Sequence, residues 1–327
     1  MQYTTLGRTG LKVSVAGLGC GGSSRLGTTA GHSDAHAVGI VQKSLDLGVN
    51  FIDTAQFYGT EPIVGAALKG RDRASVVIST KHKVSRGATP MAAANLVTSL
   101  NASLKALRTD YIDLYCLHTV LPDDYNLVAA KMVPVLLREK EKGKIRHIGI
   151  TEWAAHDHNH DMLERALTDD HWDAVMVAFH MLSQNARSRV FPATLKKNIG
   201  TLVMFAVRAL FSVPGRLQQD VRALVAAGKL PQELAAKDNP LDFLLHDNGG
   251  AKNIIEAAYR YARHEPGANV VLFGTGNPDH VATNVNAILK PALPEADRRM
   301  IEQLFGALVG VGLDEPTLKK TAKPSGN

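Results

Sequence analysis

The chain has 327 residues, 45% of them hydrophobic, which is enough apolar material for a large buried core in a soluble globular protein. Its formal net charge of +6 does not point to nucleic acid, because the basic residues are dispersed and alternate with acidic ones, as in residues 138–142. No apolar run reaches the roughly 18 residues that a membrane-spanning helix needs, so we expect neither a nucleic-acid partner nor a membrane partner.

Only two cysteines occur, Cys20 and Cys116, and both fall inside predicted strands. Small buried thiols are ordinary at such positions, and no disulfide framework is indicated. The N-terminus shows no charged and apolar leader. These features suit a reducing compartment, so we expect a cytoplasmic protein. The sequence does not indicate the oligomeric state.

Strand and helix patterns alternate along the chain. A hairpin with strands at 3–6 and 11–14 comes first. Eight apolar runs follow, which we interpret as strands at 16–20, 50–54, 76–80, 112–117, 147–150, 174–179, 201–206 and 269–274. Helical patterns lie between them, for example at 36–47, 91–107, 127–142 and 254–263. Eight strands, each followed by a helix, predict an α/β fold: a (β/α)8 TIM barrel with an N-terminal β-hairpin cap.

The competing fold is a doubly wound open sheet. That fold has a glycine-rich turn after its first strand and an acidic residue about 20 positions further on. Glycines 17, 19, 21 and 22 surround the end of the first strand, but their spacing does not match that turn. The count of eight strands also favours the barrel.

Two segments interrupt the alternation. About 45 residues, 208–252, form a long loop after strand 7, well beyond the usual connection length. We expect this insertion to be a substrate-binding lid. Residues 311–327 are rich in lysine, proline and polar residues and are expected to form a mobile C-terminal tail. Residues 1–310 are then expected to form a single barrel domain.

Four polar residues stand where predicted strands meet their loops. Asp53 ends the second barrel strand, and Tyr58 lies in the loop that follows. Lys81 and His118 end the third and fourth strands. Taken singly, each has an ordinary structural interpretation, such as a turn former, a packing residue or a surface lysine. In a parallel barrel, however, the carboxyl ends of the strands are where active sites are built, so we expect the four to converge.

The flanks of these residues resemble the aldo-keto reductase superfamily. The stretches LDLGVNFIDTAQFYG, STK, SLKALRTDYIDLYCLH and GKIRHIGIT occur in the family's order, between residues 45 and 151. The opening LGRTGLKVSVAGLGCGG and the late FGTGNPDHVATNVNAI also fit. The resemblance covers residues 3 to 305, which makes it far more specific than a short motif.

This resemblance implies an NAD(P)H-dependent oxidoreductase that interconverts a carbonyl compound and its alcohol by direct hydride transfer. Tyr58 would be the general acid and base. A phenol is a reluctant acid at neutral pH, and a nearby Lys81 ammonium would lower its pKa. Asp53 would keep Lys81 charged, and His118 would orient the carbonyl. The cofactor would be NADP(H) or NAD(H), and the substrate a small aldehyde, ketone or sugar.

The residues aligned with the nicotinamide depart from the family pattern. Relatives typically carry Ser-Asn where this chain has Thr151 and Glu152, and a glutamine where it has Met176. Thr151 can still donate a hydrogen bond to a carboxamide and Glu152 can accept one, but Met176 cannot replace the amide. Phe205 aligns with an aromatic residue that stacks on the nicotinamide ring. Plain core packing is the alternative for this phenylalanine.

The residues aligned with the adenosine end lack the usual basic pair. Relatives that use NADP offer lysine or arginine where this chain has Gly274, Gly276 and His280, and a neutral imidazole binds phosphate less well. We therefore expect modest discrimination between NADP and NAD. The remaining residues predicted to bind the cofactor are Gly21, Gly22, Arg208, which could reach the pyrophosphate, Asn277, at a helix start, and Asn284, which matches an adenine contact.

Two alternatives stay open from the sequence alone. The run 156–161, HDHNHD, looks like a metal cluster, but its spacing does not place the ligands on one helix face, so we interpret it as a polar helix start and expect no metal. A nucleotide-binding regulatory subunit of the same fold, with little turnover, is the alternative function. The complete set of four catalytic residues argues against it.

Overall fold

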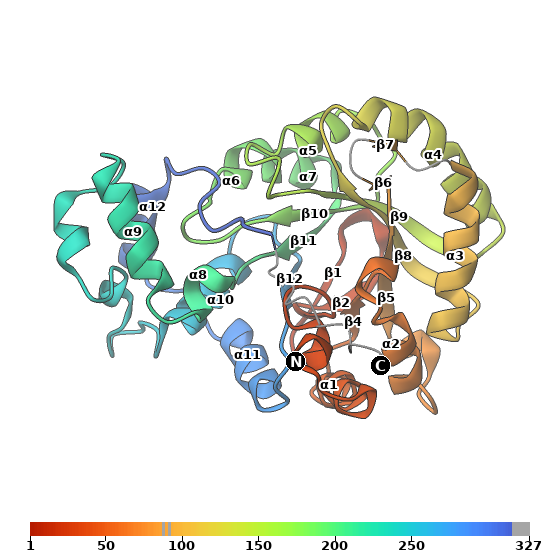
Figure 1. The fold of residues 1–327 in the computed structure, drawn as a ribbon, viewed down its shortest axis with the longest axis horizontal. Coiled ribbons are helices and arrows are strands. Elements are labelled where there is room, and N and C mark those ends of the chain that lie inside the picture. Colours follow the sequence, from red (N-terminus) through yellow and green to blue (C-terminus); the bar gives the residue numbers. More distant parts are fainter. Residues whose placement is uncertain (87–88, 91–92, 316–327) are drawn as a thin grey trace, which may run out of the picture.

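The computed structural model describes residues 1–86, 89–90 and 93–315. Eight parallel strands close into a barrel, in the order β10, β11, β12, β3, β4, β5, β8 and β9 around the ring. This confirms the predicted (β/α)8 fold (Figure 1). The strands are β3 (Ala16–Gly19), β4 (Phe51–Asp53), β5 (Val77–Lys83), β8 (Ile112–Val120), β9 (Ile145–Glu152), β10 (Ala174–Ala178), β11 (Gly200–Met204) and β12 (Val270–Phe273).

Three strands run further at their carboxyl ends than the hydrophobic pattern indicates: β5, β8 and β9, the last of which reaches Glu152. β5 continues to Lys83 and β8 to Val120, because the two strands stay paired in register up to Lys83 and His118. Lys81 therefore projects from inside β5 rather than from its last residue. Polar residues at the carboxyl ends of these strands hide this extension from a pattern based on apolar residues.

Helices between the strands form the outer ring. Two of them begin with side-chain caps: Ser33 accepts a hydrogen bond from the His36 backbone, and Asn253 accepts one from Glu256. α10 (Ile254–Arg263) has the bounds that the sequence predicts. The ring consists of α1 (Asp34–Asp46), α2 (Glu61–Ala67), α3 (Ala93–Leu107), α4 (Tyr125–Glu141), α5 (Asp161–Ala166), α6 (Ala186–Arg189), α7 (Phe191–Lys197), α10 (Ile254–Arg263), α11 (Asp279–Leu289) and α12 (Glu295–Phe305).

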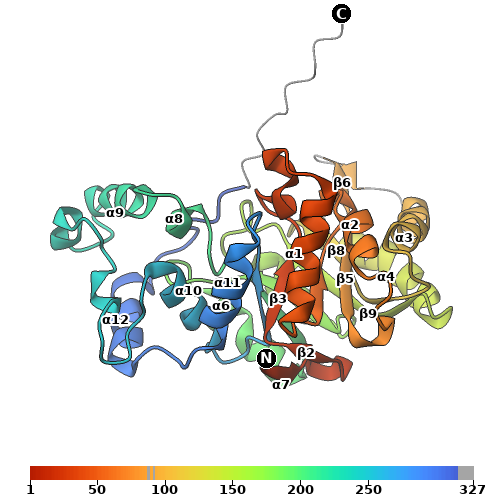
Figure 2. The ribbon, with the colours of Figure 1, turned by 90° about the horizontal axis from the view of Figure 1, so that it is seen from below.

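The barrel interior is a packed apolar core. It contains Phe51, Val77, Leu114, Met176, Leu202 and Val270. The predicted N-terminal hairpin, β1 (Tyr3–Thr5) and β2 (Lys12–Ser14), closes the amino end of the barrel. Leu6 and Val13 belong to this same core cluster. The hairpin lies at the bottom of Figure 2, and the small sheet formed by β6 (Ser85–Arg86) and β7 (Thr89–Pro90), which follows β5, marks the opposite end.

The insertion after β11 consists of short helices. They are α8 (Ala209–Ser212), α9 (Arg216–Ala226), η5 (Gln232–Ala236) and η6 (Asp242–Leu244). In both ribbon views α9 lies on the same side of the barrel as α10 and α12, and α3 and α4 lie on the other side (Figures 1 and 2). Whether the insertion acts as a lid stays a prediction.

The chain remains packed to the end of its described part. The predicted tail begins at residue 311, but Leu313 is buried against Ala154 and Ala178, so ordered structure continues to Glu315. Residues 316–327 lie outside the described part. In the described residues, no helix is both long and apolar enough to cross a membrane. The two cysteines are free and buried, as expected.

Candidate active site

The four predicted catalytic residues, Asp53, Tyr58, Lys81 and His118, converge at the carboxyl end of the barrel, and we call them the quartet. Lys81 Nζ lies 2.7 and 2.6 Å from the two carboxylate oxygens of Asp53 and also donates to the carbonyl of Thr54 at 2.8 Å. The Ser79 hydroxyl donates to Asp53 at 2.9 Å. Lys81 is fully buried, so its ammonium is held by acceptors on three sides, away from water.

Tyr58 and His118 face each other above this ion pair. Tyr58 Oη lies 3.2 Å from His118 Nε2, and their rings meet edge to face. Lys81 Nζ lies 5.1 Å from the centre of the Tyr58 ring. A phenol hydroxyl and an imidazole N–H thus share one small region. That is the arrangement a carbonyl oxygen needs to accept two hydrogen bonds.

The electrostatics of the quartet leave Tyr58 protonated at neutral pH. Burial raises the pKa of the phenol, and the Lys81 ammonium offsets this only in part, so the net pKa lies above its ordinary value. This differs from the expectation that Lys81 lowers the pKa overall. The main reason is burial, which outweighs the attraction of Lys81, and the nearby Asp53 carboxylate raises the pKa of Tyr58 further. Although burial alone would lower the pKa of Lys81, Asp53 outweighs it and raises that pKa.

His118 is neutral at physiological pH. Burial lowers the pKa of its imidazole well below the ordinary range, and the charges of Lys81 and Lys83 lower it further. A neutral imidazole has one N–H donor and one acceptor. His118 can therefore donate to a substrate oxygen without introducing a charge.

Gly21 provides the surface against which the Tyr58 ring lies. A Cβ added at Gly21 would lie 2.5 Å from a Tyr58 ring carbon. No side chain of any size fits between this backbone and the ring. The glycine after β3, predicted as a cofactor residue, thus has a direct structural role in placing the phenol.

The nicotinamide-aligned residues on β9 are buried and already hydrogen-bonded. Thr151 Oγ1 accepts from the backbone of Thr119 at 3.0 Å, which leaves its own hydroxyl hydrogen available. Glu152 accepts from the backbone of Ala178 at 2.7 Å and lies 2.7 Å from His160 Nδ1. Each oxygen of the Glu152 carboxylate therefore already has a hydrogen-bond partner within the protein.

Met176 lies on β10, and Phe205 directly follows β11. Met176 is 4% exposed and packs in the barrel core. Phe205 follows β11 with a φ of 70°, a left-handed conformation that is costly for a bulky side chain. The Arg208 guanidinium carbon lies 4.0 Å from the centre of the Phe205 ring, and Arg208 also donates to the carbonyl of Asp314. Such strain is typical of a functional position.

The loops at the predicted adenosine end approach each other through glycines. A Cβ on Gly276 would lie 2.9 Å from Gly27 Cα, and one on Gly274 would lie 3.2 Å from the Gly19 carbonyl oxygen, whereas Gly22 faces open space. Bare backbone therefore lies close to the amino end of α11. Backbone N–H groups at a helix start bind phosphate, so this arrangement fits a dinucleotide.

Polar side chains and a lysine from α1 surround this helix start. His280 is exposed in the first turn of α11, while Asn284 is largely buried one turn later. Asn277 accepts a hydrogen bond from the backbone of Asp279 at 2.9 Å. Lys43 Nζ on α1 lies 3.7 Å from the Asp279 carboxylate and is a cation that the local sequence does not reveal.

The HDHNHD run has separate structural roles. Asp157 accepts hydrogen bonds from the first two backbone amides of α5, as expected for a polar helix start. His156 binds Glu315, His158 lies against Gly310, and His160 is fully buried. Among the described residues, no group of three or more His, Cys, Asp or Glu is placed to bind a metal ion.

Sequence reasoning missed several residues beside the quartet. Lys83 shares the inward face of β5 with Lys81, and the alternation of side chains along a strand was a signal that could have found it. Phe57 and Trp153, whose rings lie near Lys83, gave no local signal. Nor did Glu315, which accepts from Trp153 Nε1 at 3.1 Å although the two residues are 162 positions apart in the sequence.

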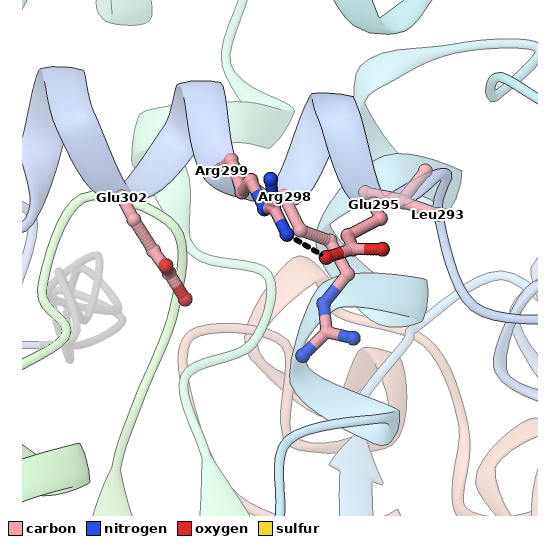
Figure 3. A pocket seen from close by; sticks show the side chains of 5 residues that line it. All are labelled: Leu293, Glu295, Arg298, Arg299 and Glu302. Atoms are coloured by element: carbon pink, nitrogen blue, oxygen red, sulfur yellow. Dashed lines mark hydrogen bonds and ion pairs between the residues drawn. The ribbon is translucent and has the colours of Figure 1, made fainter.

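A separate hollow lies along α12 (Figure 3). It is lined by Leu293, Glu295, Arg298, Arg299 and Glu302. Its two arginines and two glutamates balance in charge, and Arg299 bonds Glu295 within the same helix. None of the quartet residues lines this hollow, so it has no direct part in the chemistry described above.

Comparisons with known proteins agree with this geometry. The sequence profile described as Aldo/keto reductase family matches residues 18–305. Aldo-keto reductase YhdN of Bacillus subtilis (strain 168) is 30% identical over 302 residues, which are 85% of this chain and 86% of that protein. L-galactose dehydrogenase of Arabidopsis thaliana is 32% identical over 157 residues. This match spans about half of each protein, 46% of this chain and 48% of the dehydrogenase.

A solved structure has the same fold. The holo form of aldo-keto reductase AKR11C1 from Bacillus halodurans superposes with a TM-score of 0.70. The match covers 98% of this chain and 99% of that one, at 24% sequence identity. At this identity the likeness concerns the fold alone.

Proposed function

Because this chain belongs to the aldo/keto reductase family, we propose that it is an NAD(P)H-dependent oxidoreductase that interconverts a small carbonyl compound and its alcohol. The family match and the relative named as a reductase support carbonyl and alcohol oxidoreduction. The observation that carries the finer proposal is the buried Asp53–Lys81 pair beneath Tyr58 and His118. This assembly is costly to bury and has an evident chemical use.

In this proposal a nicotinamide cofactor, when bound, supplies the hydride. Tyr58 Oη donates the proton to the developing alkoxide and takes it back in the reverse direction. His118 Nε2 donates a second hydrogen bond that orients the carbonyl. Lys81, fixed by Asp53, stabilises the phenolate left after the proton has moved. The distances within the quartet support each of these roles.

The cofactor is proposed to lie along the carboxyl ends of β9, β10, β11 and β12. Thr151 would donate to the carboxamide and Phe205 would stack on the nicotinamide ring, whereas Glu152 keeps His160 and Ala178 as its partners. Arg208 and the α11 start would bind the phosphates, for which Arg208 would exchange its Asp314 carbonyl partner. The burial and strain of these residues support this placement.

The test is steady-state turnover of a panel of aldehydes by the wild type and by Tyr58→Phe. We expect Tyr58→Phe to lose about 10²- to 10⁴-fold in kcat, the usual contribution of a general acid. Tyr111→Phe is the matched control, because Tyr111 lies between Arg73 and Arg146 outside the quartet and should keep full activity. Equal activity of Tyr58→Phe and wild type would refute the role of Tyr58.

The same assay, run with NADPH and with NADH, tests the cofactor proposal. With glycines at 274 and 276, and with His280 and Lys43 nearby, we expect the two cofactors to differ modestly in kcat/KM. A strong preference for NADPH would contradict this. Cofactor binding without oxidation, with every aldehyde tried, would instead favour the regulatory-subunit alternative.

A further inference from the structure

A second lysine faces the mouth of the proposed active site. Lys83 lies two residues beyond Lys81 on β5, so both side chains are on the same face of the strand. It pairs in register with His118 on β8. Its Nζ lies 4.3 Å from the centre of the Phe57 ring and 5.7 Å from the Trp153 ring. The ammonium therefore lies between two aromatic rings, next to the imidazole that would orient the carbonyl.

A second cation contacts the same phenylalanine. The Arg25 guanidinium carbon lies 5.6 Å from the centre of the Phe57 ring. Arg25 has a left-handed backbone with a φ of 42°, and its buried Nε has no hydrogen-bond partner among the described residues. A strained backbone that holds an arginine with an unused donor is costly, which argues for a function.

Within the described part of the chain, no carboxylate forms an ion pair with either of the two cations at this mouth, Lys83 and Arg25. Asp53 binds Lys81, and Glu315 binds His156 and the Trp153 indole. The segments outside the described residues, 87–88, 91–92 and 316–327, contain no aspartate or glutamate. A binding site with surplus positive charge selects negatively charged ligands.

We propose that the carbonyl substrate bears an anionic group, a carboxylate or a phosphate, that binds Lys83, with Arg25 adding to the attraction. Phe57 and Trp153 would contact the hydrocarbon between this group and the carbonyl at Tyr58 and His118. This inference rests on the proposed oxidoreductase function and specifies its substrate class. Partial desolvation between the two rings strengthens an ion pair made there.

The experiment compares two aldehydes of similar shape that differ in charge: 4-carboxybenzaldehyde and its neutral amide, 4-formylbenzamide. For the wild type at low ionic strength we expect kcat/KM to be at least about tenfold higher for the acid, the factor that corresponds to about 1.4 kcal/mol. Lys83→Gln should abolish most of this ratio, mainly through KM, and Lys83→Arg should retain it. The ratio should also fall as salt screens the charges.

Lys12→Gln is the matched control. Lys12 Nζ lies 5.4 Å from the Tyr3 ring in the hairpin at the other end of the barrel, so removing this aromatic-bound lysine should leave the ratio unchanged. The salt dependence of the wild-type ratio needs no variant, so the test does not depend on the folding of Lys83→Gln.

Other outcomes separate the two proposals. Equal kcat/KM for both aldehydes, or a ratio insensitive to salt and to Lys83→Gln, overturns this inference alone. If Lys83→Gln raises KM for the cofactor and leaves the aldehyde ratio intact, Lys83 binds a cofactor phosphate and the inference is again overturned. If the wild type reduces no aldehyde at all, the proposed function falls, and this inference with it.

Discussion

Tyr58 owes its position to the residue opposite it. Because a Cβ at Gly21 would lie 2.5 Å from the phenol ring, Gly21→Ala must displace Tyr58 from His118. Near-attack geometry is sensitive to shifts of about 1 Å, so we expect about a 10²-fold loss of kcat with the fold retained. Steady-state kinetics with an aldehyde measures the loss of kcat, and circular dichroism checks that the fold is retained.

Gly39→Ala is the control for this substitution. Gly39 is on α1, where an added Cβ meets nothing within 4 Å, so activity should stay at the wild-type level. Alanine in a helix interior should even stabilise the protein slightly. An active Gly21→Ala would mean that the ring of Tyr58 has room that the structure does not show.

At the scale of residues, the quartet could be predicted from the sequence and its surroundings could not. Asp53, Lys81 and His118 mark the ends of apolar runs that any parallel barrel brings together. Glu315 reaches Trp153 through a segment with no regular structure, and nothing in either residue's neighbours encodes that contact. The net direction of the Tyr58 pKa also depends on burial, which the sequence does not state.

A buried ion pair ties β9 to the start of α5. His160 Nδ1 lies 2.7 Å from Glu152, and both side chains are fully buried. Burial alone would lower the pKa of His160, but the Glu152 carboxylate outweighs it and raises that pKa above the ordinary value of about 6.5. The contribution of protonated His160 to stability is therefore fully present below pH ~6.5, the pKa of histidine in the unfolded chain. It is lost as the pH rises through the higher pKa of His160 in the folded protein.

His160→Gln tests this link. Since it leaves Glu152 buried without its cation, we expect it to lower the free energy of unfolding by about 3 kcal/mol at pH 6, and by less at higher pH. His156→Gln removes a histidine from a half-exposed pair with Glu315 and should cost at most about 1 kcal/mol. Urea unfolding between pH 6 and pH 9 measures both. A loss for His160→Gln that grows with pH would contradict the assignment.

At the scale of elements, the strands were predicted more successfully than the connections. The eight strands are short apolar runs bounded by polar breaks, and their period is visible in the sequence. The helices of the insertion, α8 and α9, meet the rest of the molecule through contacts such as Arg216 with Asp314. The placement of α9 beside the barrel depends on partners about 100 residues away, so local pattern could not give it.

The whole molecule contains histidines that folding keeps neutral. Burial lowers the pKa of His82 to about 4 and that of His180 to about 3. The unfolded chain binds protons at these sites below its pKa of about 6.5, whereas the folded chain does not, so acid favours unfolding. Between pH 7 and pH 5 each histidine should cost about 2 kcal/mol of stability, or about 4 kcal/mol together.

Urea unfolding at pH 7, 6 and 5 measures this loss. His82→Leu should reduce the slope by about 1 kcal/mol per pH unit between pH 7 and pH 5, because up to one proton fewer is taken up on unfolding. His82 suits this change, since neither of its ring nitrogens has a hydrogen-bond partner among the described residues. His171→Gln, at an exposed site, should leave the slope as it is. A protein equally stable at pH 5 and pH 7 would disprove the account.

The contacts of Leu313, Asp314 and Glu315 have a practical consequence for handling the protein. These residues contact Ala154, Arg208 and Trp153, at the end of the barrel where we propose that the substrate binds. An affinity tag or reporter fused after residue 327 would be separated from them only by residues 316–327, about 40 Å of chain at full extension. It would therefore be tethered within reach of incoming substrate. Fusion at Met1, beside the hairpin at the opposite end, leaves that approach clear.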